Sequence, residues 1–272
     1  MKFLLCLSLS LMALFAEDKG CFVDENSQNI IFVKDGETKS LGLKEKIYKD
    51  QRCAYDESSF YVANLNNEIV KVASEKEFLF ALPNVGCKVS NILLDKEKIY
   101  VACDMANIVM IAIFDKSSKK FISKNFNNVY KISSFLPLGE GVFFTSFNGK
   151  AFLLDSKLNA KEQKSVGFAP VSACKFSDDE IFIGFRNGEI LDLKSGAKKQ
   201  VLRSKISALA CVGDEVLVAG EDGAIYKFDK SFKLKGKKEL FSGEIKEIFI
   251  DKNVLVGVDL SNKTKSLEIN LF

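Results

Sequence analysis

The sequence predicts an all-β fold in which four-stranded sheets repeat along the chain and stack into a ring. An apolar run, a tight turn and a second apolar run recur throughout the 272 residues. The copies are evenly spaced, and only 3 prolines occur, so no Pro-rich linker divides the chain. Repetition at a fixed period must be read before domain boundaries, and here it points to one architecture.

The repeating hairpin is clearest in "IFIGFRNGEILDL" at 181–193. Asn-Gly between β-rich runs signals a hairpin because both residues tolerate the positive φ that a two-residue turn requires. The hairpins begin at residues 60, 99, 142, 181 and 216, with a looser copy at 254, so the period is 35 to 43 residues. The matching turn pairs are Asn66-Asn67, Asn148-Gly149, Asn187-Gly188 and Asp222-Gly223.

A second element precedes each hairpin. A Val-Ser or Ile-Ser pair stands ten residues before four of them: Val89-Ser90, Ile132-Ser133, Val171-Ser172 and Ile206-Ser207. A short strand and a polar turn lie between, and a polar strand such as 197–203 follows. Each unit therefore has four strands, and four-stranded units at this period are typical of β-propeller blades, whose faces are buried by stacking around an axis.

The blade count follows from the chain ends. Six units begin near residues 50, 87, 130, 170, 205 and 245. Residues 21–43 read as three strands that lack a first one, and the chain stops after three strands at 266–272. We expect seven blades, with both chain ends sharing the closure so that no sheet edge stays free. Six blades plus an N-terminal strand pair is the alternative.

The N-terminus reads as a signal peptide. Lys2 precedes an apolar run from Phe3 to Ala16, and charge resumes at Glu17. A bilayer span needs roughly 20 residues, whereas this length suits a secretory h-region. We expect cleavage of residues 1–16, a periplasmic protein with one propeller domain over 17–272, and no transmembrane anchor after cleavage. An uncleaved N-terminal anchor is the alternative.

No catalytic or metal constellation is visible. Histidine is absent, which removes the usual general base and the commonest metal ligand. Acidic turns at 56–59, 95–98, 177–180 and 213–215 are spread over different units, which favours turn chemistry over calcium binding. We expect no catalytic residue, no metal and no cofactor.

The charge is nearly balanced, +3 for the whole chain, which with export argues against nucleic acid. Basic runs at 116–124, 194–205 and 227–240 could form a partner-binding face. We interpret them instead as solvated outer strands whose lysines discourage edge pairing.

Six cysteines follow the predicted cleavage site. Cys87 and Cys103 flank one hairpin and are the best candidates for a disulfide. Cys53 and Cys174 hold the same place in repeats three blades apart, too far to bond to each other. We expect at least half of the six to be small buried apolar residues in strands.

The positions at the ends of the hairpins differ between units, and they form a possible partner-binding rim. They are Asn64, Asp104, Phe147, Arg186 and Glu221. The alternative is that they are ordinary turn residues. Varied residues on a repeated scaffold are where such folds place binding, since loops carry function.

The strand period, the Asp/Glu turn before the second strand and the Asx-Gly turn after it resemble the WD40-like β-propeller superfamily across the chain. The Trp-Asp and Gly-His signatures are missing, since neither Trp nor His occurs. The resemblance therefore implies architecture only.

More narrowly, the short signal peptide, the propeller repeats and the Lys/Phe/Asn-rich composition are similar to the NapL-type accessory protein encoded with periplasmic nitrate reductase in epsilonproteobacteria. That likeness implies support of the reductase or of its electron supply. We expect a monomeric, exported, non-enzymatic propeller that binds a protein partner. The alternative is a small-ligand binder or an enzyme with carboxylates in the central channel.

Overall fold

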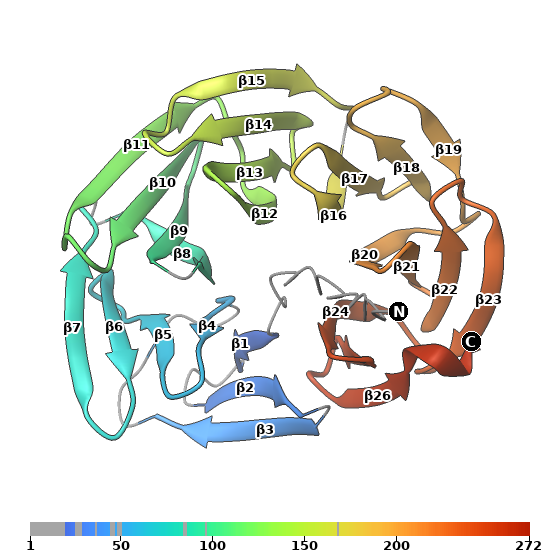
Figure 1. The fold of residues 1–272 in the computed structure, drawn as a ribbon, viewed down its shortest axis with the longest axis horizontal. Helices are drawn as coiled ribbons and strands as arrows, with labels where there is room; N and C mark the ends of the chain where they lie inside the picture. The colour runs from blue at the N-terminus through green and yellow to red at the C-terminus, as the bar shows by residue number, and fades with distance from the viewer. Residues whose placement is uncertain are drawn as a thin grey trace, which may run out of the picture.

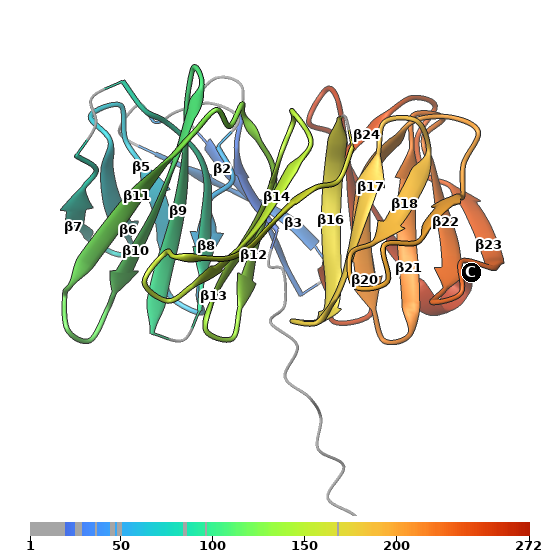
Figure 2. The same ribbon diagram turned by 90° about the horizontal axis from the view of Figure 1, so that it is seen from above.

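A computed structural model describes residues 20–24, 29–35, 37–43, 47, 51–83, 86–95, 97–167 and 169–272. Seven antiparallel sheets stand around a common axis, as Figure 1 shows, and in side view the ring is a disc (Figure 2). The predicted all-β propeller and its seven blades are confirmed. The predicted signal peptide at residues 1–16 lies outside the described residues.

Within each blade the strands follow one another from the axis to the circumference. Blade 1 holds β1 (Cys21–Val23), β2 (Asn29–Lys34) and β3 (Glu37–Gly42); blade 2 holds β4 (Ala54–Tyr55), β5 (Phe60–Ala63), β6 (Glu68–Val72) and β7 (Lys76–Ala81); blade 3 holds β8 (Lys88–Leu94), β9 (Lys98–Met105), β10 (Ile108–Asp115) and β11 (Phe121–Asn127). Blade 4 holds β12 (Ile132–Leu138), β13 (Gly141–Ser146), β14 (Lys150–Asp155) and β15 (Ala160–Ser165); blade 5 holds β16 (Pro170–Ser177), β17 (Glu180–Phe185), β18 (Glu189–Asp192) and β19 (Lys198–Gln200). Blade 6 holds β20 (Ile206–Val212), β21 (Glu215–Gly220), β22 (Ala224–Asp229) and β23 (Leu234–Glu239); blade 7 holds β24 (Ile245–Asp251), β25 (Val254–Asp259) and β26 (Thr264–Glu268), followed by the 3-10 turn η1 (Ile269–Leu271).

Burial falls from the middle of a blade to its outside. Every residue of β13 is buried, whereas all but one residue of β23 is exposed. Aromatic side chains fill the space between neighbouring blades: Phe126 of blade 3 packs edge-on against Phe144 of blade 4, with ring centroids 5.4 Å apart. Stacking of one apolar sheet face on the next is the source of stability that the repeat pattern predicted. No helix among the described residues is long and apolar enough to cross a bilayer.

The conserved spacing of the Val/Ile-Ser pairs has a structural cause. The innermost strand of five blades carries a register shift at this place, as between Val89 and Asn91 in blade 3 and between Ile206 and Ala208 in blade 6. A β-bulge leaves one residue out of the ladder and increases the local twist. The residue left out is serine in blades 3, 4 and 6, where its hydroxyl can bond locally, as Ser207 Oγ does to the Ala219 carbonyl at 3.2 Å. In blade 5 it is Val171 and in blade 7 it is Lys246.

The ring closes by packing between blades 1 and 7. Phe22 of β1 stacks on Phe249 of β24 with centroids 6.3 Å apart, and Lys252 Nζ lies 2.9 Å from Asp35 Oδ1. Within the described residues the two terminal sheets share no strand and have three strands each. Among the described residues no strand lies outside β26, so the expected closure through both chain ends is not seen in that part of the chain.

Blade 1 receives an inner partner from the chain that leads into blade 2. Phe22 of β1 forms an antiparallel bridge with Arg52, and Val23 donates its N–H to the Gln51 carbonyl at 2.9 Å. Residues 51–53 therefore occupy the place of the first strand that the sequence found missing from blade 1.

All six cysteines of the described chain form disulfides: Cys21–Cys53, Cys87–Cys103 and Cys174–Cys211. The expectation that at least half of them are unpaired apolar residues was wrong. Cys87 and Cys103, the pair favoured by the sequence, are joined within blade 3. Cys53 and Cys174 bond to other cysteines, each on an innermost segment: Cys53 to β1 of blade 1 and Cys174 to β20 of blade 6.

Candidate functional site

The five predicted rim residues lie on one face of the disc. Four of them directly follow the second strand of their blade, and Asp104 is the last residue but one of β9. Because successive strands are antiparallel, the second turn of every blade and the connection into the next blade lie on the same face. On this surface, we call the second turns of blades 2 to 7 and the connection into blade 4 the loop rim. It consists of residues 64–67, 104–107, 128–131, 147–149, 186–188, 221–223 and 260–263.

Asn64 and Asp104 have structural partners. Asn64 is buried, and its Oδ1 accepts the N–H groups of Asn66 at 2.9 Å and Glu68 at 3.0 Å, which builds the turn. Asp104 Oδ1 accepts the Ile132 N–H at 2.9 Å and so ties blade 3 to blade 4. Burial raises the pKa of the Asp104 carboxyl, against the opposing effect of that hydrogen bond.

Phe147, Arg186 and Glu221 share a backbone role. Each donates its N–H to the chain segment that leads into its own blade, at Lys131, Ala169 and Lys205 respectively, over 2.9 to 3.2 Å. The side chains of Arg186 and Glu221 are exposed, and that of Phe147 is half-buried. The turns are thus fixed by the backbone while three side chains reach the surface of the loop rim.

The structure adds an apolar arc that sequence reasoning missed. Leu65 of blade 2 and Tyr130 at the start of blade 4 are 51% and 52% exposed, and Met105 of blade 3 is half-buried beside Asp104. With Phe147 they form the apolar arc: Leu65, Met105, Tyr130 and Phe147. A large side chain in a polar loop such as "NNVYK" was a usable signal, but exposure could be judged only after the loop had a position.

One carboxylate on an innermost strand is paired with a cation. Arg52 Nε lies 3.3 Å from Glu247 Oε2 of blade 7, so the Glu247 carboxylate has a cation beside it. Among the described residues, no group of three or more His, Cys, Asp or Glu side chains is arranged to hold a metal ion.

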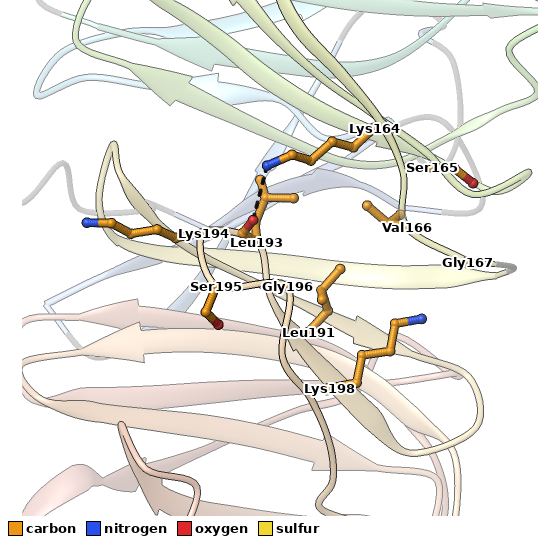
Figure 3. Close-up of a pocket in the computed structure, with 10 residues that line it drawn as sticks. All are labelled: Lys164, Ser165, Val166, Gly167, Leu191, Leu193, Lys194, Ser195, Gly196 and Lys198. Carbon is orange, nitrogen blue, oxygen red and sulfur yellow. Dashed lines mark hydrogen bonds between the residues drawn. The ribbon is translucent and has the colours of Figure 1, made fainter.

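A groove of about 440 Å³ separates blades 4 and 5 at the circumference. Figure 3 shows Val166 and Leu191 facing each other across it, with Lys164 and Lys198 at its two ends. Lys164 Nζ bonds the Leu193 carbonyl at 3.3 Å, and Lys198 Nζ lies 4.9 Å from the centre of the Phe185 ring. Both amines are already engaged by the chain and do not converge on one point, so the groove presents no anion site.

Three solved structures resemble this chain. BBS1N, crystallised in complex with ARL6DN, matches with a TM-score of 0.72 and 13% identity over 92% of this chain and 86% of that one. The WD40 β-propeller domain of Doa1 matches with a TM-score of 0.66 and 12% identity, over 93% of this chain and 94% of that one. The computationally designed Ika8 protein matches with a TM-score of 0.64 and 13% identity, over 89% of this chain and 81% of that one.

No protein-family model and no curated protein sequence matches the chain. At 12–13% identity the likeness to the solved structures is one of fold and carries no function with it. The seven sheets and their strand order, together with the likeness to the WD40 domain of Doa1, show that the chain has a seven-bladed, WD40-like β-propeller fold.

Proposed function

We propose that this protein is a protein-binding scaffold that docks its partner on the loop rim. The observation that supports the proposal most is the apolar arc on blades 2 to 4, where Leu65 and Tyr130 are half exposed at turns fixed by hydrogen bonds. Exposed apolar side chains that cluster on a rigid surface mark interaction sites. BBS1N, a structural neighbour, was crystallised with a protein partner.

The narrower form of the proposal is an exported, monomeric, non-enzymatic accessory factor in the periplasm. Its support is the predicted signal peptide, the disulfides that an oxidising compartment preserves, and the engaged Glu247 at the axis. Support of periplasmic nitrate reductase or its electron supply rests on the sequence resemblance alone. Co-purification with that reductase from periplasm is the test of this part.

The loop rim is tested by capture of partners from periplasm with two matched variants. Leu65→Ser with Tyr130→Ser removes the two exposed members of the apolar arc and should abolish capture. Phe78→Ser with Leu234→Ser removes side chains of similar exposure from outer strands β7 and β23 and should leave capture unchanged. If both variants and the unmodified chain capture equal amounts of partner, the partner binds elsewhere, and the proposal that it docks on the loop rim is rejected.

A further inference from the structure

Among the described residues, blade 7 has one strand fewer than blades 2 to 6. β26 is its outermost strand, whereas blades 2 to 6 each carry a fourth strand outside the third. No described residue pairs with the outer edge of β26. Figure 1 shows β26 on the circumference, with the C-terminal turn beside it toward β23. The C-terminus does not cover the edge, because Phe272 instead packs against Gly236 of β23, with its Cβ 3.3 Å from an added Cβ there.

The hydrogen bonds at both ends of β26 identify its outward backbone groups. Asp259 donates to the Lys263 carbonyl at 2.9 Å, and Ile269 donates to the Asn253 carbonyl at 2.9 Å. Hydrogen-bonded pairs alternate along an antiparallel ladder, so Lys265 and Leu267 point their backbone groups at β25. Thr264, Ser266 and Glu268 point theirs outward. Such a row of free groups is a template for one more strand.

Apolar side chains stand at both ends of this edge. Leu260, in the turn just before β26, is 59% exposed, and Leu271, just after it, is 56% exposed. If the edge of β26 stayed solvated, the exposure of these two leucines to water would add nothing to the stability of the fold. An extended segment lying along β26 would cover both, which adds apolar burial to the main-chain hydrogen bonds.

The charges around the edge favour an acidic segment. Lys263 is exposed, as are Lys233 and Lys238 on or beside the neighbouring outer strand β23, while Lys265 is exposed with its Nζ 5.1 Å from the centre of the Phe241 ring. The exposed acids of the two strands are Glu268 of β26 and Glu239 of β23, so the lysines outnumber them. Two copies of the chain pairing antiparallel about Ser266 would set their Lys265 side chains diagonally on one face, where like charges repel. The surroundings therefore suit an extended acidic partner better than a second copy.

We propose that an extended, acidic and apolar segment of a partner protein adds to β26 as the fourth strand of blade 7. Main-chain hydrogen bonds to Thr264, Ser266 and Glu268 would hold it, and Lys263, with the lysines of β23, would select carboxylates. This edge lies outside the apolar arc and is tested separately from it, although Leu260 and Lys263 belong to the blade 7 turn of the loop rim.

Amide hydrogen exchange tests the edge directly. In the processed chain alone, the amides of Thr264, Ser266 and Glu268 should exchange fast and those of Lys265 and Leu267 slowly. An acetylated nonapeptide that alternates Glu and Val, added to about 1 mM as expected for weak main-chain recognition, should slow the three outward amides at least about tenfold. No slowing at that concentration would overturn the proposal.

Variants separate edge pairing from general stickiness. Ser266→Pro removes an outward N–H without breaking the ladder to β25 and should weaken the nonapeptide at least about tenfold, whereas Ser266→Ala should bind like the parent. Leu65→Ser with Tyr130→Ser should also bind the nonapeptide normally, whatever it does to the loop rim. Equal affinity in Ser266→Pro and Ser266→Ala would overturn the proposal.

The other occupants give distinct results. Outward amides that are already protected in the dilute chain would show that its own N-terminal segment fills the edge. Protection that rises with protein concentration, together with a dimer in sedimentation, would assign the edge to a second copy. Either result replaces the partner segment proposed above.

Discussion

At the scale of single residues, backbone conformation sets which turn positions accept a side chain. Gly188 has φ +86°, and an added Cβ would overlap the carbonyl oxygens of Leu202 and Ser204. Gly196 has φ +74° with no atom within 4 Å of that place. Gly196→Ala should therefore lower the free energy of unfolding by about 1–2 kcal/mol through strain alone, and Gly188→Ala by roughly 3–4 kcal/mol through strain plus overlap.

Urea unfolding of the two variants under oxidising conditions measures that difference. Asn67, at the same turn position in blade 2, already has φ +60°, so the conformation alone is tolerated by an L-residue. If both variants lose the same free energy of unfolding, the carbonyl oxygens of Leu202 and Ser204 beside Gly188 add nothing to the cost of the substitution.

Asp104 carries a pH-dependent contribution to stability. Burial raises the pKa of its carboxyl in the folded chain above the ordinary 3.8, so folding favours the protonated form. The favourable contribution is present below the ordinary value and is lost as the pH rises through the folded one. Asp104→Asn keeps an oxygen for the Ile132 N–H and removes the charge, so it should raise the free energy of unfolding at pH 7.

The gain from Asp104→Asn should shrink as the pH falls through the raised value, which urea melts across the acid range would show. Asp104→Ala is the control. Like the Asn variant it removes the charge, but it leaves the Ile132 N–H without its acceptor, so its free energy of unfolding should lie about 1–3 kcal/mol below that of the Asn variant at every pH. A gain from the Asn variant that persists unchanged at acid pH would contradict the assigned role of burial.

At the scale of strands and blades, the disulfide between Cys174 and Cys211 joins the innermost strands of blades 5 and 6 across 37 residues of sequence. Loss of a cross-link over a loop of this length should lower the free energy of unfolding by roughly 2–4 kcal/mol. Cys174→Ala with Cys211→Ala should show that loss in guanidinium melts. The matched Cys87→Ala, Cys103→Ala variant, with a separation of 16, should lose less if chain entropy dominates.

Elements were predicted well where local chemistry decides them. Asn187-Gly188 specifies its hairpin by turn conformation, and the Ile206-Ser207 pair marks a bulge that the strand pattern alone can place. Cysteine pairing was predicted less well. Cys174 meets Cys211 only because neighbouring blades bring their first strands together, and spacing along the chain contains no measure of that approach.

The candidate site shows the same division. Sequence variation at the turns located the face that carries Phe147, Arg186 and Glu221, since turn position follows from strand order. The sequence could not show that the side-chain oxygens of Asn64 and Asp104 accept backbone N–H groups, nor that Leu65 and Tyr130 are exposed. Those properties depend on which chain segment lies opposite, and that is set by the closed ring.

At the scale of the whole molecule, the ring is closed by packing and by one residue near the axis. Arg52 donates its N–H to the Ser90 carbonyl and accepts from Ile92, both at 2.9 Å, and bridges Phe22 of blade 1. Its side chain reaches Glu247 of blade 7 at 3.3 Å. Residue 52, at the start of blade 2, therefore contacts blades 1, 3 and 7. The repeat pattern of the sequence does not predict these contacts.

A double-mutant cycle separates the side-chain part of this closure from the backbone part. Arg52→Met and Glu247→Gln both leave the hydrogen bonds of the residue 52 backbone intact. Arg52→Met strands a carboxylate whose side chain is only 16% exposed, so it should cost more than Glu247→Gln, which leaves a cation that is 34% exposed and sits 5.9 Å over the Phe249 ring. Because the two groups share one contact, the double variant should lose about 1–2 kcal/mol less than the sum of the single losses in urea. Losses that add within about 0.5 kcal/mol would mean that the axial ion pair does not contribute to closing the ring, and that the other contacts between blades 1 and 7, such as the packing of Phe22 on Phe249, hold them together.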